Sequence, residues 1–246
     1  MDVRSIQFDP RRALRAARIL ARNPDALPEV FTVIESLSLG TIARLRRRLA
    51  RTASGRRLVE ARPDIVALLA DRAALARLPD GSLGRAYLDF VEREGISADG
   101  IRGASAEGTR GSLPPPLDWV NGRLSDTHDL WHAAVGIHGD VDPDGGIHGD
   151  VLGETVLLAF TLAQTWNPAI ALIVGIGEVK LADHPGALRL IADGFRRGWR
   201  AAWLLEQEWE ALLALPLDEV RARLRLEEPL AYRPLRSSEL RAAGAL

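Results

Sequence analysis

The sequence contains no cysteine, a single lysine (Lys180) and few aromatic residues. The lack of cysteine excludes disulfides, thiolate zinc sites and cysteine nucleophiles, and it fits a reducing compartment. Any transition metal must therefore bind through histidine and carboxylate side chains. Because Lys180 stands alone, almost all positive charge is carried by arginine.

Neither sign of charge dominates, since the formal net charge is -1 over 246 residues. Residues 1–60 hold 13 arginines and 6 acidic residues, whereas residues 61–246 hold 19 basic and 27 acidic ones. This balance argues against a nucleic-acid partner. The first residues mix acids with bases and lack an apolar run, so we expect no signal peptide and a cytoplasmic location.

Hydrophobic periodicity predicts a mostly helical chain. Helices are expected at residues 10–22, 41–51, 64–78, 84–93, from Ser125 or Asp126 to about 136, from Glu154 onward, and at about 186–213. A helix can restart only after Pro116, because three prolines end the loop at 96–117. We predict an all-α fold, a single domain over 1–246 that contains an antiparallel helix bundle. Its N-terminal helices are arginine-rich, and its tail after Pro229 is irregular.

Residues 155–177 form an uncharged run of 23 residues, which is long enough to span roughly 30 Å of hydrocarbon. Asn167 and Pro168 interrupt it in the middle, and Gln164 and several threonines dilute it. Two short buried helices on either side of Asn167 are therefore favoured over a membrane span. The wall of a lipid-binding cavity is a third interpretation and has the same geometry.

His128 and His132 are four residues apart on an expected helix, so both side chains lie on one face, where one cation can bridge them. Asp129 and Glu154 can add carboxylate oxygens. This ligand set suits zinc or non-haem iron, and it predicts a metal site between two helices. The alternative is a chance histidine pair, with Asp129 interacting only with the helix dipole.

The segment between these groups contains a duplication. Residues 136–141 read GIHGDV, and residues 146–151 repeat them ten positions later. The repeat adds histidines and aspartates close to the expected metal: His138, His148, Asp140, Asp142, Asp144 and Asp150. It imitates the start of an EF-hand loop, but Val151 stands where the bidentate Glu belongs, so a solvated loop is the simpler interpretation.

The motif His128-Asp129-Leu130-Trp131-His132, followed by Gly153-Glu154, resembles the signature of the coenzyme Q biosynthesis protein 4 family. In that family eleven residues separate the second histidine from the glutamate, and here 21 do. The excess of ten equals the period of the duplication. Further similarity runs from about residue 38 to 228, through Arg62-Pro63, the stretch 78–87 and Trp209-Glu210.

The resemblance implies an all-α protein of ubiquinone synthesis with one divalent metal, usually zinc, bound by His128, Asp129, His132 and Glu154. It implies oxidative decarboxylation of a polyprenylated 4-hydroxybenzoate-type ring at C1. It also implies contact with other enzymes of the pathway and with the inner membrane surface. Of two arginines that the family places before the first histidine, Arg123 matches one and Ser125 replaces the other.

Other side chains have two interpretations each. Arg123 can pair with a substrate carboxylate, or it is a surface arginine near a helix start. The i, i+4, i+8 series Phe195, Trp199 and Trp203 can line a prenyl tail, or it is a plain core stripe. The flanking Arg196, Arg197 and Arg200, together with the N-terminal arginine faces, can contact anionic lipid headgroups, or they are solvated.

Three functions compete at this point. The first is the metal-dependent decarboxylase, and the second is a non-catalytic scaffold that binds prenylated intermediates. The third, an HD-type phosphohydrolase, needs a histidine upstream of His128, and the sequence has none. We expect a homo-oligomer.

Overall fold

The computed structural model describes residues 8–23, 26–96, 113–137 and 150–242. The described residues form helices and connections, with two isolated bridges and no strand. This confirms the all-α prediction. The chain divides into two compact units. Within the described residues, the first comprises 42–96, 113–136 and 201–229, and the second comprises 8–23, 26–41, 137, 150–200 and 230–242. Whether they act as one domain over 1–246 stays a prediction.

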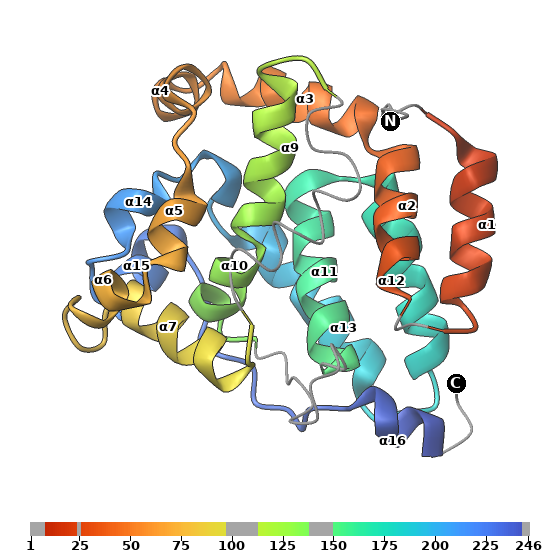
Figure 1. Cartoon of the computed structure of the whole chain (residues 1–246). Coiled ribbons are helices and arrows are strands. Elements are labelled where there is room, and N and C mark those ends of the chain that lie inside the picture. Colours follow the sequence, from red (N-terminus) through yellow and green to blue (C-terminus); the bar gives the residue numbers. More distant parts are fainter. Residues whose placement is uncertain (1–7, 24–25, 97–112, 138–149, 243–246) are drawn as a thin grey trace. The chain divides into compact units, whose positions relative to one another are not determined.

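The first unit is built from short helices. In chain order they are α3 (Leu39–Leu49), which starts in the second unit, α4 (Ala53–Ala61), α5 (Ile65–Ala70), α6 (Arg72–Ala76), α7 (Leu83–Arg93), α9 (Leu117–Asp126), α10 (His128–Val135), the 3-10 turn η1 (Leu204–Glu206), α14 (Trp209–Leu212) and α15 (Leu217–Leu224). Helices α7 and α15 both pack on α10 (Figure 1). Trp131 and Trp209 are fully buried in this unit.

The second unit contains longer helices: α1 (Pro10–Leu20), α2 (Leu27–Leu37), α11 (Val151–Thr165), α12 (Pro168–Leu181), α13 (Ala187–Arg200) and the short α16 (Ser237–Ala242). Helix α11 packs on both α12 and α13, and α1 packs on α2 (Figure 1). The buried side chains of Ala16, Leu20, Val33 and Ala169 form a core where α1, α2 and α12 meet.

The uncharged run folds as two helices, as expected. Helix α11 ends at Trp166, which adopts a left-handed backbone conformation with φ 48°. Asn167 then begins α12 by accepting a hydrogen bond from the Ala169 amide at 2.9 Å, and Pro168 occupies the first helical position, where no amide donor is needed. None of the helices in the described part of the chain has the length and apolarity to cross a bilayer.

Two expected helices are wrong in extent. The predicted helix over 64–78 divides into α5 and α6, because the Asp71 carboxylate accepts from the Ala74 amide and starts a new helix. The predicted helix over 186–213 ends at Arg200, where the chain passes into the other unit. There the Ala202 amide donates to the Leu224 carbonyl at 2.8 Å instead of continuing the helix.

The expected N-caps Ser125 and Asp126 are also wrong, because both lie in the last turn of α9. Thr127 ends α9 and begins α10, and its hydroxyl donates to the Arg123 carbonyl at 2.8 Å. The restart after Pro116 is confirmed, since α9 begins at Leu117. Helices α2, α4, α9, α15 and α16 are not among the expected helices, and α16 lies in the tail after Pro229 that the sequence predicts to be irregular.

Candidate metal centre

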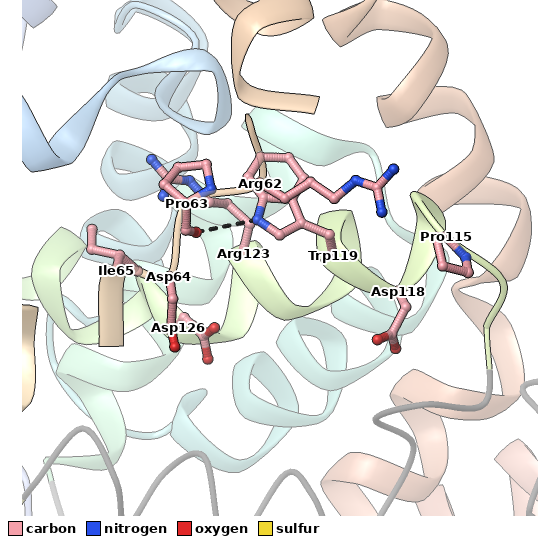
Figure 2. Close-up of a pocket in the computed structure, with 9 residues that line it drawn as sticks. All are labelled: Arg62, Pro63, Asp64, Ile65, Pro115, Asp118, Trp119, Arg123 and Asp126. Carbon is pink, nitrogen blue, oxygen red and sulfur yellow. Dashed lines mark hydrogen bonds between the residues drawn. The ribbon is translucent and has the colours of Figure 1, made fainter. Parts of the chain in front are cut away.

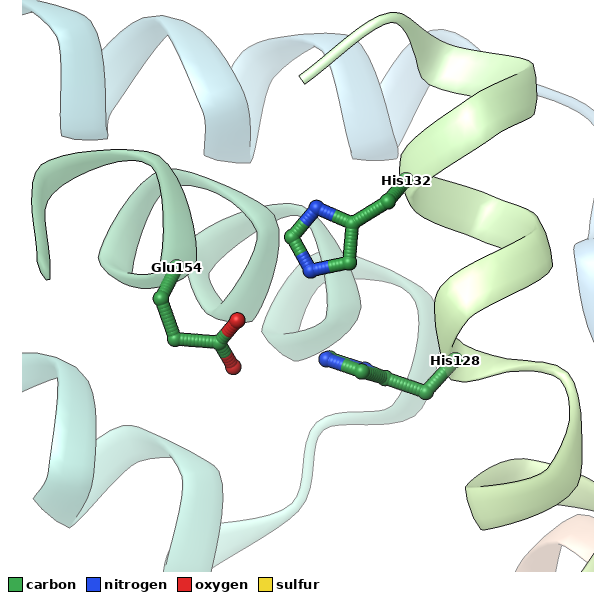
Figure 3. A group of neighbouring side chains, drawn as sticks. All are labelled: His128, His132 and Glu154. Carbon is green, nitrogen blue, oxygen red and sulfur yellow. The ribbon is translucent and has the colours of Figure 1, made fainter. Parts of the chain in front are cut away.

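Helix α10 places both histidines on one face. It begins directly after Thr127 and ends at Gly136, whose φ of 74° is readily adopted only by glycine. The rings of His128 and His132 lie 5.0 Å apart between centroids and are nearly perpendicular, at 86° (Figure 3). His132 is buried, at 3% exposed, and His128 is half-buried. The helical period therefore brings the pair together as the sequence predicts.

An aromatic ring from α7 holds the orientation of His132. The Phe90 ring stacks on the His132 ring, with centroids 5.4 Å apart and an interplanar angle of 14°. Phe90 is itself buried, at 3% exposed, and the guanidinium of Arg93 lies over its ring at 5.8 Å. Because the imidazole rests on a packed surface, its rotation is restricted. No motif pointed to Phe90, since its contact with His132 depends on how α7 packs on α10.

Replacing Phe90 by Leu is expected to weaken binding of a divalent cation by about tenfold, because side chains that orient a metal ligand typically contribute at this level. Leucine keeps the position apolar but removes the flat stacking surface. Competition titration with a zinc chelator measures the change. Phe90→Tyr keeps the stack and should restore affinity, whereas equal affinity of the Leu variant and the unchanged protein would contradict the role.

Glu154 is positioned by the capping of α11. Asp150 accepts hydrogen bonds from the amides of Leu152 at 3.1 Å and Leu235 at 2.8 Å, and the Tyr232 hydroxyl donates to its second oxygen. Asp150 is fully buried, so the first turn of α11 is fixed from several directions. Glu154 follows in that turn and is half-buried. The helix thus opens at Val151, three residues before the expected start.

One ligand atom each of His128, His132 and Glu154 lies within 4.8 Å of the other two. Figure 3 shows ring nitrogens of both histidines and the carboxylate turned toward a common space. Two nitrogens and one carboxylate match the protein ligands of open, catalytic metal sites. Since the histidines belong to the first unit and Glu154 to the second, their joint action is a proposal.

Asp129 and the duplicated loop were also expected near the metal. Asp129 is buried on α10 and is not a member of this group of three, so its role as a ligand stays a prediction. His138, His148, Asp140, Asp142 and Asp144 lie outside the described residues.

Arg123 is not a surface residue, which corrects one of its two interpretations. Its side chain is 1% exposed and pairs with Glu210, to which one terminal nitrogen donates at 3.0 Å. That nitrogen also donates to the Gln207 carbonyl at 3.0 Å. The buried Nε has no hydrogen-bond partner. Arg123 therefore anchors α9, which leads directly into α10, and its role toward a substrate stays a prediction.

Arg123 lines a cleft of about 270 Å³ in the first unit (Figure 2). The indole of Trp119 forms part of its wall and donates to the Pro63 carbonyl at 3.3 Å. The cleft is lined by arginines, aspartates, prolines, one isoleucine and one tryptophan: Arg62, Pro63, Asp64, Ile65, Pro115, Asp118, Trp119, Arg123 and Asp126. This mixed charge gives no preference for a ligand of one sign.

The expected stripe of Phe195, Trp199 and Trp203 is wrong. Helix α13 ends at Arg200, so Trp203 lies outside it and belongs to the first unit. Trp203 is buried, and the guanidinium of Arg48 lies 3.9 Å from its ring centre. Trp199 is instead 63% exposed, so it is not a core residue.

The described residues form a helical protein that carries a candidate ligand set for a divalent metal, two histidines and one glutamate. Comparison of the sequence with models of protein families assigns the chain to one family. Residues 13–230 match the family model described as "Coenzyme Q (ubiquinone) biosynthesis protein Coq4". The chain belongs to this family. The match begins upstream of residue 38, where the sequence resemblance was expected to start, and so includes most of α1.

Individual relatives agree with this assignment. The chain is 29% identical over 217 residues to the "Ubiquinone biosynthesis protein COQ4 homolog, mitochondrial" of Danio rerio, covering 85% of this chain and 72% of that protein. It is 30% identical over 198 residues to the protein of the same name in Bos taurus, and the match covers 79% of this chain and 69% of that protein. It is 30% identical over 201 residues to the "Ubiquinone biosynthesis protein coq4, mitochondrial" of Aspergillus clavatus, and the match covers 79% of this chain and 64% of that protein. The chain thus spans about two thirds of its relatives' lengths.

A solved structure supports the fold. A crystal structure at 2.85 Å resolution of a protein from Nostoc punctiforme superposes with a TM-score of 0.61, covering 90% of this chain and all of that one. The two sequences are 22% identical, so this likeness concerns the fold alone.

Proposed function

We propose that this protein acts in ubiquinone biosynthesis as a metal-dependent enzyme, which removes the C1 carboxylate of a polyprenylated 4-hydroxybenzoate-type ring and replaces it with a hydroxyl. Membership of the family supports the pathway. The observation that carries the chemistry is the grouping of His128, His132 and Glu154. Zinc is the expected metal and iron the alternative.

The overall change requires an oxidant. A ring carboxylic acid and water give the phenol, carbon dioxide, two protons and two electrons, so an acceptor of two electrons must take part. A bound divalent cation supplies Lewis acidity toward a carboxylate or phenolate oxygen. In this proposal His128, His132 and Glu154 hold the cation and leave positions for substrate. The burial of His132 limits water around it, which strengthens electrostatic interactions.

The polyprenyl tail needs an apolar surface that starts at the metal. Leu158, Thr161 and Leu162 lie on the same face of α11 as Glu154, at helical spacing, and all three are half-buried. The rest of α11 between Thr155 and Thr165 is buried apart from these positions. This partly open face supports the placement of the tail along α11, beyond the carboxylate.

The partners follow from the pathway. We propose that the chain receives a prenylated aromatic precursor and works beside other ubiquinone-biosynthesis proteins, as a homo-oligomer. Several relatives carry the word mitochondrial in their names. For this chain we propose action in the cytoplasm or at the inner membrane surface.

Metal analysis of the purified protein beside a His132→Ala variant tests the centre. The unchanged protein is expected to hold about one divalent ion per chain, and the variant to lose affinity by about a hundredfold or more, because one of three protein ligands is gone. His184→Ala is the matched control, since His184 is half-buried on the α12–α13 connection and outside the group. Equal metal content in the His132 variant and the unchanged protein would remove His132 from the site.

A further inference from the structure

Helix α11 contains three threonines, and one of them does not use its hydroxyl within the helix. The hydroxyls of Thr155 and Thr165 each donate to the carbonyl four residues earlier, Val151 and Thr161, at 2.7 Å. The Thr161 hydroxyl oxygen is buried and has no hydrogen-bond partner among the described residues. A buried hydroxyl without a partner is costly, because it has given up its hydrogen bonds to water. This oxygen is therefore a candidate contact for a bound molecule.

The neighbouring helices α12 and α13 meet α11 on other sides. Gly198 of α13 packs closely on Phe160, and Gly177 of α12 packs on Thr155. Thr161 lies about 100° from Phe160 and about 120° from Thr155 around the helix axis, so it is on a different side of α11 from both contacts. Thr161 is accordingly only half-buried as a residue.

The face of α11 that holds Thr161 begins at Glu154, whose carboxylate points into the space of the candidate metal centre (Figure 3). From the first turn onward this face presents the carboxylate of Glu154, the apolar Leu158, the hydroxyl of Thr161 and the apolar Leu162. A prenylated 4-hydroxybenzoate carries its groups in a matching order: a carboxylate for the cation beside Glu154, a flat apolar ring, a phenolic hydroxyl and an apolar tail. The sequence of side chains along α11 therefore complements this class of molecule group by group.

The lengths agree as well. Thr161 is two helical turns beyond Glu154, which corresponds to a rise of about 10.5 Å. In a 4-hydroxybenzoate the carboxyl carbon and the hydroxyl oxygen are about 6 Å apart, and one hydrogen bond adds about 2.8 Å. The ring acid therefore spans most of the distance between the two residues, and the reach of the Glu154 side chain covers the rest.

We propose that Thr161 is a specificity-determining residue, whose hydroxyl hydrogen-bonds the oxygen para to the substrate carboxylate and so selects 4-hydroxylated ring acids. The inference rests on the proposed function, because the cation beside Glu154 places the carboxylate end of the substrate. A threonine hydroxyl both donates and accepts, so it suits a phenol as well as a phenolate. Leu158 and Leu162 flank it on the half-buried face, and changes of leucine rotamer let a flat ring reach the buried oxygen.

The test is titration calorimetry of the zinc-loaded full chain with two acids. One is 4-hydroxybenzoate with a geranyl tail beside its hydroxyl, and the other is the same acid without the hydroxyl. The unchanged protein is expected to bind the hydroxylated acid about tenfold more tightly, because a site built for a hydroxyl rejects the analogue that lacks it. Thr161→Val keeps the shape of the side chain but removes its hydroxyl, and it is expected to bind both acids equally.

Two further variants control for folding and for the loss of any hydroxyl on α11. Thr161→Ser retains the hydroxyl and should retain the preference for the hydroxylated acid. Thr165→Val is the matched control, because the Thr165 hydroxyl donates to a carbonyl of its own helix, and it should also retain the preference. Circular dichroism checks that all three variants keep their helices.

Four outcomes overturn the role of Thr161. They are binding of neither acid, no preference in the unchanged protein, a preference that persists in Thr161→Val, and equal weakening of both acids by Thr161→Val, which would make Thr161 a packing residue only.

Release of carbon dioxide, measured on the same samples, separates this inference from the proposed function. A preference that Thr161→Val abolishes, without any release by the unchanged protein, would support the hydroxyl contact and contradict decarboxylation. Release by the unchanged protein, together with an unaltered preference in Thr161→Val, would contradict the hydroxyl contact alone.

Discussion

Replacing Glu154 by Gln is expected to lower turnover of the prenylated ring acid by about a hundredfold or more, while the protein stays folded. Glutamine has nearly the same shape as glutamate but is neutral. It therefore binds a cation more weakly and offsets less of the cation's positive charge. Helix α11 is capped by Asp150 and does not depend on Glu154 for its start. Release of labelled carbon dioxide from a substrate labelled in its carboxyl group measures turnover, and circular dichroism measures folding.

The same variant separates the enzyme from the scaffold. A scaffold that only holds prenylated intermediates would keep lipid binding and partner assembly in the Glu154→Gln variant, and it would show no turnover before the change. Glu178→Gln is the matched control, because Glu178 is an exposed carboxylate on α12. Turnover that survives in the Glu154 variant at the level of this control would exclude Glu154 from the reaction.

Replacing Gly198 by Ala is expected to destabilise the second unit by about 2 kcal/mol or more, because overpacking between helices has costs of this size. A Cβ atom at Gly198 would lie 2.4 Å from the Phe160 carbonyl oxygen and 2.9 Å from its Cα, both of which are backbone atoms of α11. The helices would have to separate, and the 2.6 Å hydrogen bond from Gln164 to the Gly198 carbonyl would weaken.

Thermal unfolding measures this effect, and a loss of roughly 4–8 °C in the midpoint is expected for a chain of this size. Gly175→Ala is the matched control: it lies on α12, a Cβ there meets nothing within 4 Å, and alanine should stabilise the helix by about 1 kcal/mol. Similar midpoints of thermal unfolding for the two variants would show that the close approach of α13 to α11 does not contribute to stability.

Local patterns were sufficient to predict much of this molecule. The i, i+4 spacing of His128 and His132 and the interruption at Asn167 depend only on helical geometry and on proline chemistry, and both are confirmed. The ten-residue excess in the connection to Glu154 was also visible in the sequence.

What the sequence did not predict depends on distant contacts. The end of α13 at Arg200 follows from pairing of the next residues with the end of α15, and no local signal marks it. The burial of Arg123 requires Glu210, which lies 87 residues away. Trp203 fitted the helical spacing of Phe195 and Trp199, yet it lies in another unit, because period alone cannot show where a helix stops.

The duplicated segment divides one task between its two copies. The first copy supplies Gly136, which ends α10, and the buried Ile137, whereas the second supplies Asp150, which begins α11. In a single copy the same six residues would have to perform both tasks at once. Each of the two helices therefore has its terminal residue in a different copy. The residue that ends the helix of His132 and the residue that begins the helix of Glu154 therefore come from different copies of the repeat.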